Sequence, residues 1–206
     1  MFTYKVYNDF IPDYYQDSIE IYLKDLMRWK FNANVSGVDA SMANLPEGLE
    51  IADHQTGFGG FIFSDALGWP TEEKMLSMLQ PMISKILSLL PTQLYVGRVR
   101  GGLFVNSGKN KLHAPHVDFH VPHYTFLYYV NDSDGDTFIF NEKVNPAMGE
   151  NQNYPDKFTL LERVSPKKGD AILFNGLHYH SSSTPEHHDS RIALNINLFP
   201  SWEEEL

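Results

Sequence analysis

From Gln93 onward the chain consists of short, closely spaced segments rich in β-branched and aromatic residues. Turn residues separate these segments, notably Asp134-Gly135 and the run 166–170, and such a series is typical of antiparallel strands. We interpret 132–136 as a hairpin turn, because its glycine is misplaced for a calcium-binding loop and the final glutamate is missing. The expected strands are 94–105, 124–130, 137–140, 158–164, 171–174 and 192–199.

Two helices are expected before these strands. Residues 13–30 follow Pro12-Asp13, which offers a turn and an N-cap, with Gln16 as the capping-box partner. Residues 71–90 place methionine, leucine and isoleucine on one face at helical spacing, which indicates core packing rather than a ligand site. We therefore predict a mainly β fold, a β-sandwich or jelly roll with N-terminal α-helices packed on one sheet.

Length and loop composition extend this prediction. A chain of 206 residues that is 42% hydrophobic can bury one sizeable core. We expect a single domain over 1–206, with helical support over about 1–92 and the jelly-roll core over about 93–200. Glycine and proline are dense between 31 and 70, which predicts loops and short strands near a cleft. Residues 53–69 and 143–156 are candidate lids or recognition loops.

The chain contains no cysteine. Disulfides, iron–sulfur clusters and thiolate zinc sites are therefore excluded, and any metal must be bound by histidine and carboxylate side chains. The formal net charge of −10 argues against stable nucleic-acid binding, which needs clustered lysine and arginine. The start lacks the apolar run of a signal peptide, and no later stretch approaches about 18 apolar residues. We therefore expect a cytoplasmic protein without a membrane partner.

Most of the nine histidines gather in two segments, one before and one after the central strands. In His116-Val117-Asp118 the side chains at i and i+2 of an extended segment point to the same side and can bind one metal. His180 can supply a third ligand if the strand 171–174 runs beside this segment. Two histidines and one carboxylate would leave positions open on Fe(II). His178 can face the same side and remains an alternative third ligand.

Arg191 lies eleven residues after His180 and begins an apolar, alternating run that ends at Leu198. On such a strand its side chain can point into a barrel. A buried guanidinium without a partner is costly, whereas a dicarboxylate ligand offers the bidentate pairing that arginine geometry suits. An ordinary ion pair with an acidic side chain is the alternative.

In its C-terminal half the chain resembles the 2-oxoglutarate- and iron(II)-dependent dioxygenases, especially the branch that contains the prolyl 4-hydroxylases. The resemblance covers about 94–199 and rests on an ordered series of motifs. It implies a double-stranded β-helix fold, in agreement with the expected strands. The motifs are His116-Val117-Asp118, the strand 124–131, Asp134-Gly135-Asp136-Thr137, the run 166–174, His180 and the run 191–197.

The resemblance also implies roles for individual residues. His116, Asp118 and His180 correspond to the iron ligands of the family. Arg191 corresponds to the basic residue that binds the C5 carboxylate of 2-oxoglutarate.

Further contacts with the co-substrate are implied less specifically. Tyr129 matches a position where some prolyl hydroxylases add a tyrosine hydroxyl to the C5 carboxylate, and a plain core aromatic is the alternative. Asn197 falls where family members often line the co-substrate pocket, and plain strand polarity is the alternative. Many relatives carry a tyrosine upstream of the His-x-Asp motif, but 98–106 contains none. Arg98 and Arg100 could compensate or bind substrate, so the contacts of the second carboxylate stay open.

The activity that the resemblance implies is hydroxylation with Fe(II), 2-oxoglutarate and O2, with release of succinate and CO2. Asp118 favours hydroxylation or a related oxidation over halogenation, because family halogenases vacate that position for chloride. A prolyl or other protein residue is the first substrate expected, and a small metabolite or nucleobase is the alternative. A zinc hydrolase and a non-catalytic jelly-roll binding module are the rival functions.

Overall fold

The computed structural model describes residues 3–37, 44–90 and 93–201. Within them the chain is mainly β, with antiparallel strand pairs and few helices. The helices are α1 (Asp13–Ile21), a π-helical segment (Tyr22–Leu26), α2 (Glu73–Ser88) and short 3-10 segments at Asp65–Leu67 and Pro146–Asn151. The strands are β1 (Tyr4–Tyr7), β2 (Lys30–Asn32), β3 (Gly57–Ser64), β4 (Trp69–Pro70), β5 (Leu94–Val105), β6 (Tyr124–Tyr129), β7 (Thr137–Lys143), β8 (Leu160–Val164), β9 (Ala171–Asn175), β10 (His178–Ser182) and β11 (Ser190–Pro200).

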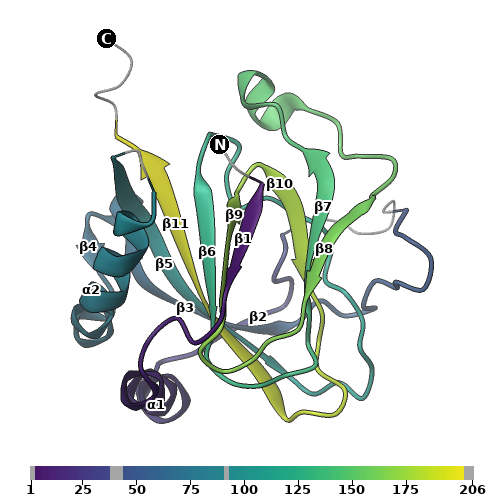
Figure 1. Ribbon diagram of the computed structural model, residues 1–206. Coiled ribbons are helices and arrows are strands. Elements are labelled where there is room, and N and C mark those ends of the chain that lie inside the picture. Colours follow the sequence, from purple (N-terminus) through teal and green to yellow (C-terminus); the bar gives the residue numbers. More distant parts are fainter. Residues whose placement is uncertain (1–2, 38–43, 91–92, 202–206) are drawn as a thin grey trace.

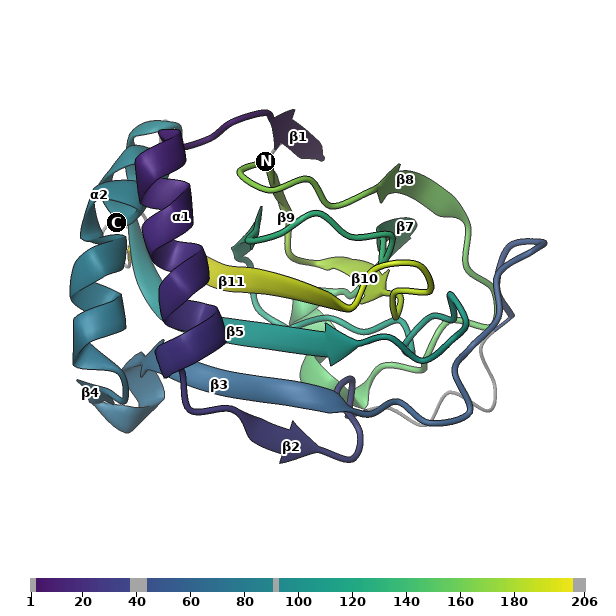
Figure 2. The same cartoon turned by 90° about the horizontal axis from the view of Figure 1, so that it is seen from below.

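The described strands form two sheets. The large sheet has the order β1-β9-β6-β11-β5-β3-β2, with β4 paired to β3, and the small sheet has the order β10-β7-β8. In Figure 1 α2 lies to the left of the large sheet, α1 lies at its lower left, and the small sheet lies to its right. The predicted mainly β architecture with two antiparallel layers is confirmed, and Figure 2 shows α1 and α2 side by side against the large sheet.

Strand β11 shows why the two faces of the large sheet differ. Alternate side chains of a strand point to opposite faces, and the apolar ones, such as Leu194 and Ile196, join the core beneath the helices. The residues between them, including Arg191, Asn195 and Asn197, face the small sheet. Polar side chains are thereby carried into the space between the two sheets.

The N-terminal helices differ in detail from the prediction. The first helix begins at Asp13, but its regular part ends at Ile21 and the π-helical segment ends at Leu26, so it does not reach Lys30. The prediction of a capping box is wrong, because no side chain forms a capping hydrogen bond at the N-terminus of this helix. Gln16 is buried and donates from Nε2 to the carbonyl of Ile11 instead.

Two of the strands that were not expected as such carry residues of the site. β3 runs for eight residues through the glycine-rich stretch and pairs with both β2 and β5. β10 carries His178 and His180 in the small sheet. The hairpin turn at 132–136 is wrong, because β6 and β7, which it joins, belong to different sheets. The Asp134 carboxylate accepts hydrogen bonds from the backbone of 186–188 and fixes a crossing between the layers.

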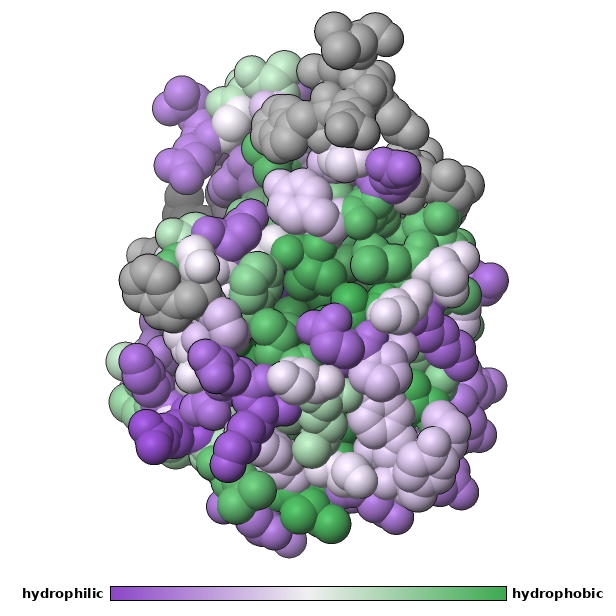
Figure 3. All heavy atoms as spheres, turned by 90° about the vertical axis from the view of Figure 1, so that its left-hand side faces the viewer, coloured by the Kyte–Doolittle hydropathy of each residue, from purple (hydrophilic) through white to green (hydrophobic). Residues whose placement is uncertain are grey.

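The outer face beside α2 is mixed in polarity. Apolar side chains occupy the middle of this face and hydrophilic ones surround them (Figure 3). Beneath it α2 buries Met75, Leu79 and Met82 in the core, as its spacing predicted. None of the described helices is both long and apolar enough to cross a lipid bilayer.

Candidate functional site

His116, Asp118 and His180 come together between the two sheets. One potential ligand atom from each lies within 4.8 Å of the others. The backbone of His116 pairs with that of His180 as an isolated antiparallel bridge, with N–O distances of 2.9 Å in both directions. The extended segment carrying His116 therefore extends the small sheet beside β10, and the i, i+2 spacing places Asp118 on the same side.

Hydrogen bonds orient both imidazole rings. Nδ1–H of His116 donates to the carbonyl of Ala114 at 3.1 Å, and Nδ1–H of His180 donates to the carbonyl of His178 at 3.2 Å. A carbonyl only accepts, so each ring is protonated at Nδ1 and leaves Nε2 free as a ligand. Nε2 of His180 lies 3.9 Å from Oδ2 of Asp118.

The Asp118 carboxylate is held from two sides. Oδ1 pairs with Nη2 of Arg98 at 2.5 Å. Oδ2 accepts from the side-chain amides of Asn195 at 2.9 Å and Asn197 at 2.8 Å. Burial alone would raise the pKa of Asp118, but the Arg98 guanidinium, the two histidines and the Asn195 amide hold it well below its usual range.

The donor set is therefore in the protonation state that a metal requires. Burial lowers the pKa of His180 to about 4, and it also lowers that of His116. Near neutral pH both imidazoles are uncharged and Asp118 is ionised. Two neutral nitrogens and one carboxylate can bind a divalent cation without first releasing a proton.

Arg191 is the cation at the other end of the same cavity. Its side chain is only 3% exposed, Nε donates to the carbonyl of Gly135 at 2.7 Å, and Nη2 donates to Oγ1 of Thr137 at 2.9 Å. Burial lowers the pKa of Arg191. No carboxylate of the described residues lies within ion-pair distance of it, so the ordinary ion pair considered from the sequence is not found there.

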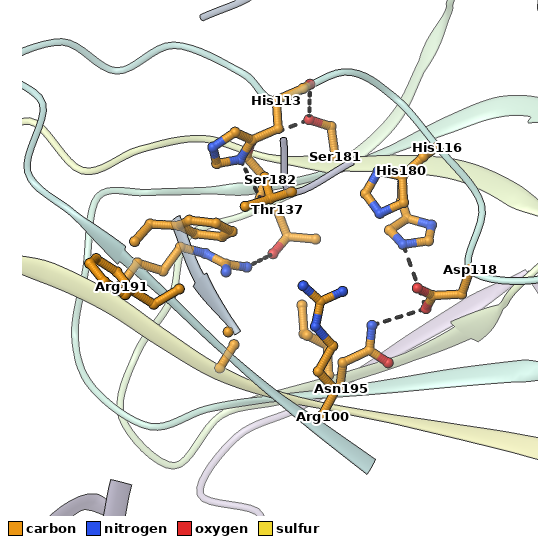
Figure 4. Close-up of a pocket in the computed structure, with 16 residues that line it drawn as sticks. Arg100, His113, His116, Asp118, Thr137, His180, Ser181, Ser182, Arg191 and Asn195 are labelled. Carbon is orange, nitrogen blue, oxygen red and sulfur yellow. Dashed lines mark hydrogen bonds and ion pairs between the residues drawn. The ribbon is translucent and has the colours of Figure 1, made fainter. Parts of the chain in front are cut away.

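One cavity of about 90 Å³ joins the two ends. Its floor is set by the register of β11 and β5, in which Arg191 lies opposite Phe104, Ala193 opposite Gly102, and Asn195 opposite Arg100. A Cβ on Gly102 would meet no atom within 4 Å, so the glycine leaves the middle of the floor open. Figure 4 shows Arg191 at one end, the His–Asp–His group at the other and the Arg100 guanidinium between them.

Tyr129 and Asn197 both lie one contact away from this cavity. Tyr129 is fully buried and donates its hydroxyl to Oγ1 of Thr137 at 2.9 Å, and burial raises its pKa to about 12. Asn197 is fully buried too, donates to Asp118 and accepts from Nε of Arg98 at 2.8 Å. Tyr129 thus supports the Arg191 end through Thr137, and Asn197 supports the metal-ligand end through Asp118.

The remaining histidines do not join the group of ligand atoms. His178 donates from Nδ1 to the carbonyl of Phe140, and a register shift in β10 separates it from His180. His113 is completely buried, its ring lies 4.3 Å from that of Phe104, and it lines the cavity. Its Nδ1 lies 3.1 Å from Oγ of Ser182, and its Nε2 has no partner among the described residues. His113 therefore belongs to the buried wall of the cavity and not to the ligand group.

Four further polar residues of the site were not assigned a definite role from the sequence. Asn195 could have been found, because it lies at i+4 from Arg191 on the same strand face. Thr137 could not, because its place beside Arg191 depends on pairing between sheets. Arg98 and Arg100 were expected either to compensate for the missing tyrosine or to bind substrate, and the structure separates them: Arg98 binds Asp118, whereas Arg100 lines the cavity.

The two candidate recognition loops both reach the neighbourhood of the site. Phe58 of β3, from the stretch 53–69, lines the main cavity. Gln152 and Tyr154, from the stretch 143–156, line a second recess of about 290 Å³ on the other side of His116. The Tyr154 hydroxyl donates to the carbonyl of Pro115 and ties this loop to the His116 segment.

Sequence comparison finds neither a matching family model nor a matching curated protein. Solved structures match over almost the whole chain. An oxidoreductase of the 2OG-Fe(II) oxygenase family from Burkholderia pseudomallei has a TM-score of 0.64 at 13% identity, covering 95% of this chain and 84% of its own. The non-haem α-ketoglutarate-dependent epimerase SnoN of nogalamycin biosynthesis has a TM-score of 0.63 at 14% identity, covering 96% and 78%.

A prolyl hydroxylase from Trichoplax adhaerens, solved in complex with a hypoxia-inducible-factor peptide fragment, has a TM-score of 0.57 at 15% identity. The match covers 96% of this chain and 84% of that one. These identities are too low to carry an activity from one protein to another. The chain therefore shares the fold of 2-oxoglutarate- and Fe(II)-dependent oxygenases, as the sequence resemblance implied.

Proposed function

We propose that this protein is a non-haem Fe(II)- and 2-oxoglutarate-dependent dioxygenase that hydroxylates its substrate and releases succinate and CO2. One observation carries the proposal. A two-histidine, one-carboxylate group and a buried arginine that has no carboxylate partner among the described residues line the same cavity. A metal site needs only the first, whereas a site for a metal-bound dicarboxylate needs both.

The donor set fits Fe(II). His116, Asp118 and His180 offer one neutral nitrogen, one carboxylate oxygen and one neutral nitrogen, all within 4.8 Å of one another. Three ligands of this type hold Fe(II) in oxygenases and leave three positions for other molecules. Bound there, the iron would supply the activation of O2 that no protein side chain can perform.

Arg191 fits the distal carboxylate of 2-oxoglutarate. The Thr137 hydroxyl accepts hydrogen bonds from both Arg191 and Tyr129, so its own proton is free to be donated into the cavity. A carboxylate at this end would meet a guanidinium and a hydroxyl donor in surroundings from which water is largely excluded. Charge-assisted hydrogen bonds are strongest in such a place.

The protein's own contribution is to hold and align. Asn195 and Asn197 fix Oδ2 of Asp118, while Arg98 keeps that carboxylate ionised. Backbone carbonyls fix the ring orientations of His116 and His180. Outer contacts of this kind set ligand geometry and commonly change metal affinity when they are removed.

We also assign the fold as a double-stranded β-helix in one domain over 1–206. The strand order supports this assignment. From β5 onward the chain passes repeatedly between the two sheets, with β5, β6, β9 and β11 in the large sheet and β7, β8 and β10 in the small one. The His116 segment lies beside β10 between β5 and β6, and it completes the second set.

Succinate formation tests the proposed activity. Purified protein with Fe(II), 2-oxoglutarate and O2 should form succinate slowly even without a primary substrate. Formation should require both the metal and O2, and it should be lost in His180→Ala but retained in His187→Ala, a matched change at an exposed histidine. A zinc hydrolase could use the same three ligands, but it would consume no O2 and form no succinate.

A further inference from the structure

Arg100 is a half-buried cation with no counter-ion among the described residues. It lines the cavity and takes part in no hydrogen bond or ion pair with any of them. Its one contact of note is with the ring of Phe61, whose centroid lies 5.9 Å from the guanidinium carbon. Burial, reinforced by the neighbouring Arg98, lowers the pKa of Arg100. A partly desolvated guanidinium in this position is suited to an anion.

The nearest carboxylate is already engaged. Asp118 is paired with Arg98 and accepts from Asn195 and Asn197, and its remaining capacity faces the proposed metal. The distal carboxylate of the co-substrate is assigned to Arg191, which lies four residues from Asn195 along β11. Arg100, opposite Asn195 on β5, is left for another anion.

The guanidinium of Arg100 reaches over Gly59 of β3. Nη2 and Nε lie 2.9 Å and 3.2 Å from the position that a Cβ of Gly59 would occupy. Nδ2 of Asn32 lies 2.8 Å from the same position. Two sets of hydrogen-bond donors therefore meet above Gly59, and the absence of a side chain on this residue gives them room.

Apolar side chains border this pair of donors. Val35 and Phe58 line the cavity beside Arg100, and Phe61 is 48% exposed on the adjoining part of β3. A charged donor pair next to exposed aromatic surface fits a molecule with one anionic end and one apolar part.

We propose that the primary substrate carries a carboxylate, bound by Arg100 and Asn32, attached to an apolar or aromatic group that rests on Phe58 and Phe61. That the bound anion is a substrate rests on the proposed oxygenase function, whereas the anion site itself rests only on Arg100, Asn32, Phe58 and Phe61. Because the Arg100 guanidinium meets the Asn32 amide above Gly59, and Arg191 is already assigned to the distal carboxylate of the co-substrate, Arg100 is assigned to the substrate.

Calorimetric titration with phenylacetate and its neutral isostere phenylacetamide tests this assignment without turnover. Both probes are titrated into the metal-free protein and into the Fe(II)·2-oxoglutarate protein under argon. Phenylacetate should bind about tenfold or more tightly than phenylacetamide, because a charge-assisted hydrogen bond is lost with the amide. Arg100→Met should abolish this preference and Asn32→Ala should reduce it about threefold, while Arg191→Met and the exposed Arg28→Met should leave it unchanged.

The outcomes separate this inference from the proposed function. Equal binding of the two probes, or a preference that survives Arg100→Met, overturns the anion site even if 2-oxoglutarate binds normally. A preference lost in Arg191→Met instead shows that the probe occupies the co-substrate end, and it also overturns the assignment. Weakened 2-oxoglutarate binding in Arg100→Met would assign the guanidinium to the co-substrate, and it would also overturn the proposal. An Arg100-dependent preference in a protein that binds no 2-oxoglutarate supports the anion site and refutes the oxygenase.

Discussion

Arg191→Met should separate co-substrate affinity from folding stability. The substitution keeps most of the buried volume and removes the charge, together with hydrogen bonds to the Gly135 carbonyl and to Thr137. Because the described residues provide no carboxylate partner for Arg191, the metal-free protein loses no ion pair. The free energy of unfolding should therefore change by only about 1 kcal/mol, since two lost hydrogen bonds are offset by relief from burying a charge.

The affinity for 2-oxoglutarate should fall much further. A buried charge-assisted pair between a guanidinium and a carboxylate contributes about 3 kcal/mol when one partner is removed, which corresponds to a roughly 150-fold higher Kd. Calorimetry under argon, with 2-oxoglutarate titrated into the Fe(II) protein, measures the affinity. Urea denaturation of the metal-free protein measures the stability.

Arg28→Met is the matched control, since Arg28 is exposed in the connection between the π-helical segment and β2 and does not line the cavity. Iron binding itself should be unchanged in both variants, because Arg191 contacts none of the three ligands. A Kd for 2-oxoglutarate within threefold of the parent protein in Arg191→Met would refute the assignment of this residue.

Three other perturbations have distinct expected outcomes. Gly102→Val should weaken 2-oxoglutarate binding, measured by calorimetry, and leave the melting temperature unchanged, because a Cβ on Gly102 meets no atom within 4 Å and the side chain would occupy the open cavity floor. Gly97→Val should instead lower the melting temperature, because its Cβ would lie 2.4 Å from the Phe199 ring. The reverse pattern would contradict the assignment of this cavity to 2-oxoglutarate. Arg98→Met should lower the unfolding free energy of the metal-free protein by about 3 kcal/mol, because it removes the ion-pair partner of the buried Asp118 carboxylate. Fe(II) should restore part of this loss, because it would bind the same carboxylate. Equal losses with and without iron would argue that Arg98 and the metal do not share Asp118. Acidification from pH 7 to pH 5 should lower the unfolding free energy of the metal-free protein by about 2 kcal/mol through His113, because burial lowers the pKa of His113 to about 3 and the unfolded chain takes up the proton first. In His113→Gln the loss of unfolding free energy, measured by urea denaturation at both pH values, should be smaller by that amount. The same dependence of stability on pH in the variant and the parent protein would refute this role of His113.

The strands and the site residues could be predicted from the sequence to different extents. β5 was predicted to the residue, and the other strands with strong apolar alternation were predicted within a few residues, because side-chain periodicity is a local property. β3 was missed because its glycines suppress the apolar signal, although they are used to fit against Phe104, Met27 and Arg100. β10 was missed because its run of histidine and serine lacks the usual strand composition.

Spacing along the chain indicated the ligand group but not its surroundings. His116 and Asp118 lie two residues apart, so their shared side follows from strand geometry. The pairing of Arg98 with Asp118 and of Thr137 with Arg191 depends on which strands become neighbours, and sequence spacing does not contain that information. For the same reason Tyr129 and Asn197 could be placed near the co-substrate but not behind Thr137 and Asp118, where the structure has them.

The central claim is that one cavity holds Fe(II) and 2-oxoglutarate in direct contact. Anaerobic addition of both to the apoprotein, followed by visible absorption, tests it most directly, because only a chelated pair gives the weak metal-to-ligand charge-transfer band. The band should appear with the parent protein, require both components and be absent in Asp118→Ala. Binding of iron without the band, or a band that survives Asp118→Ala, would contradict the claim.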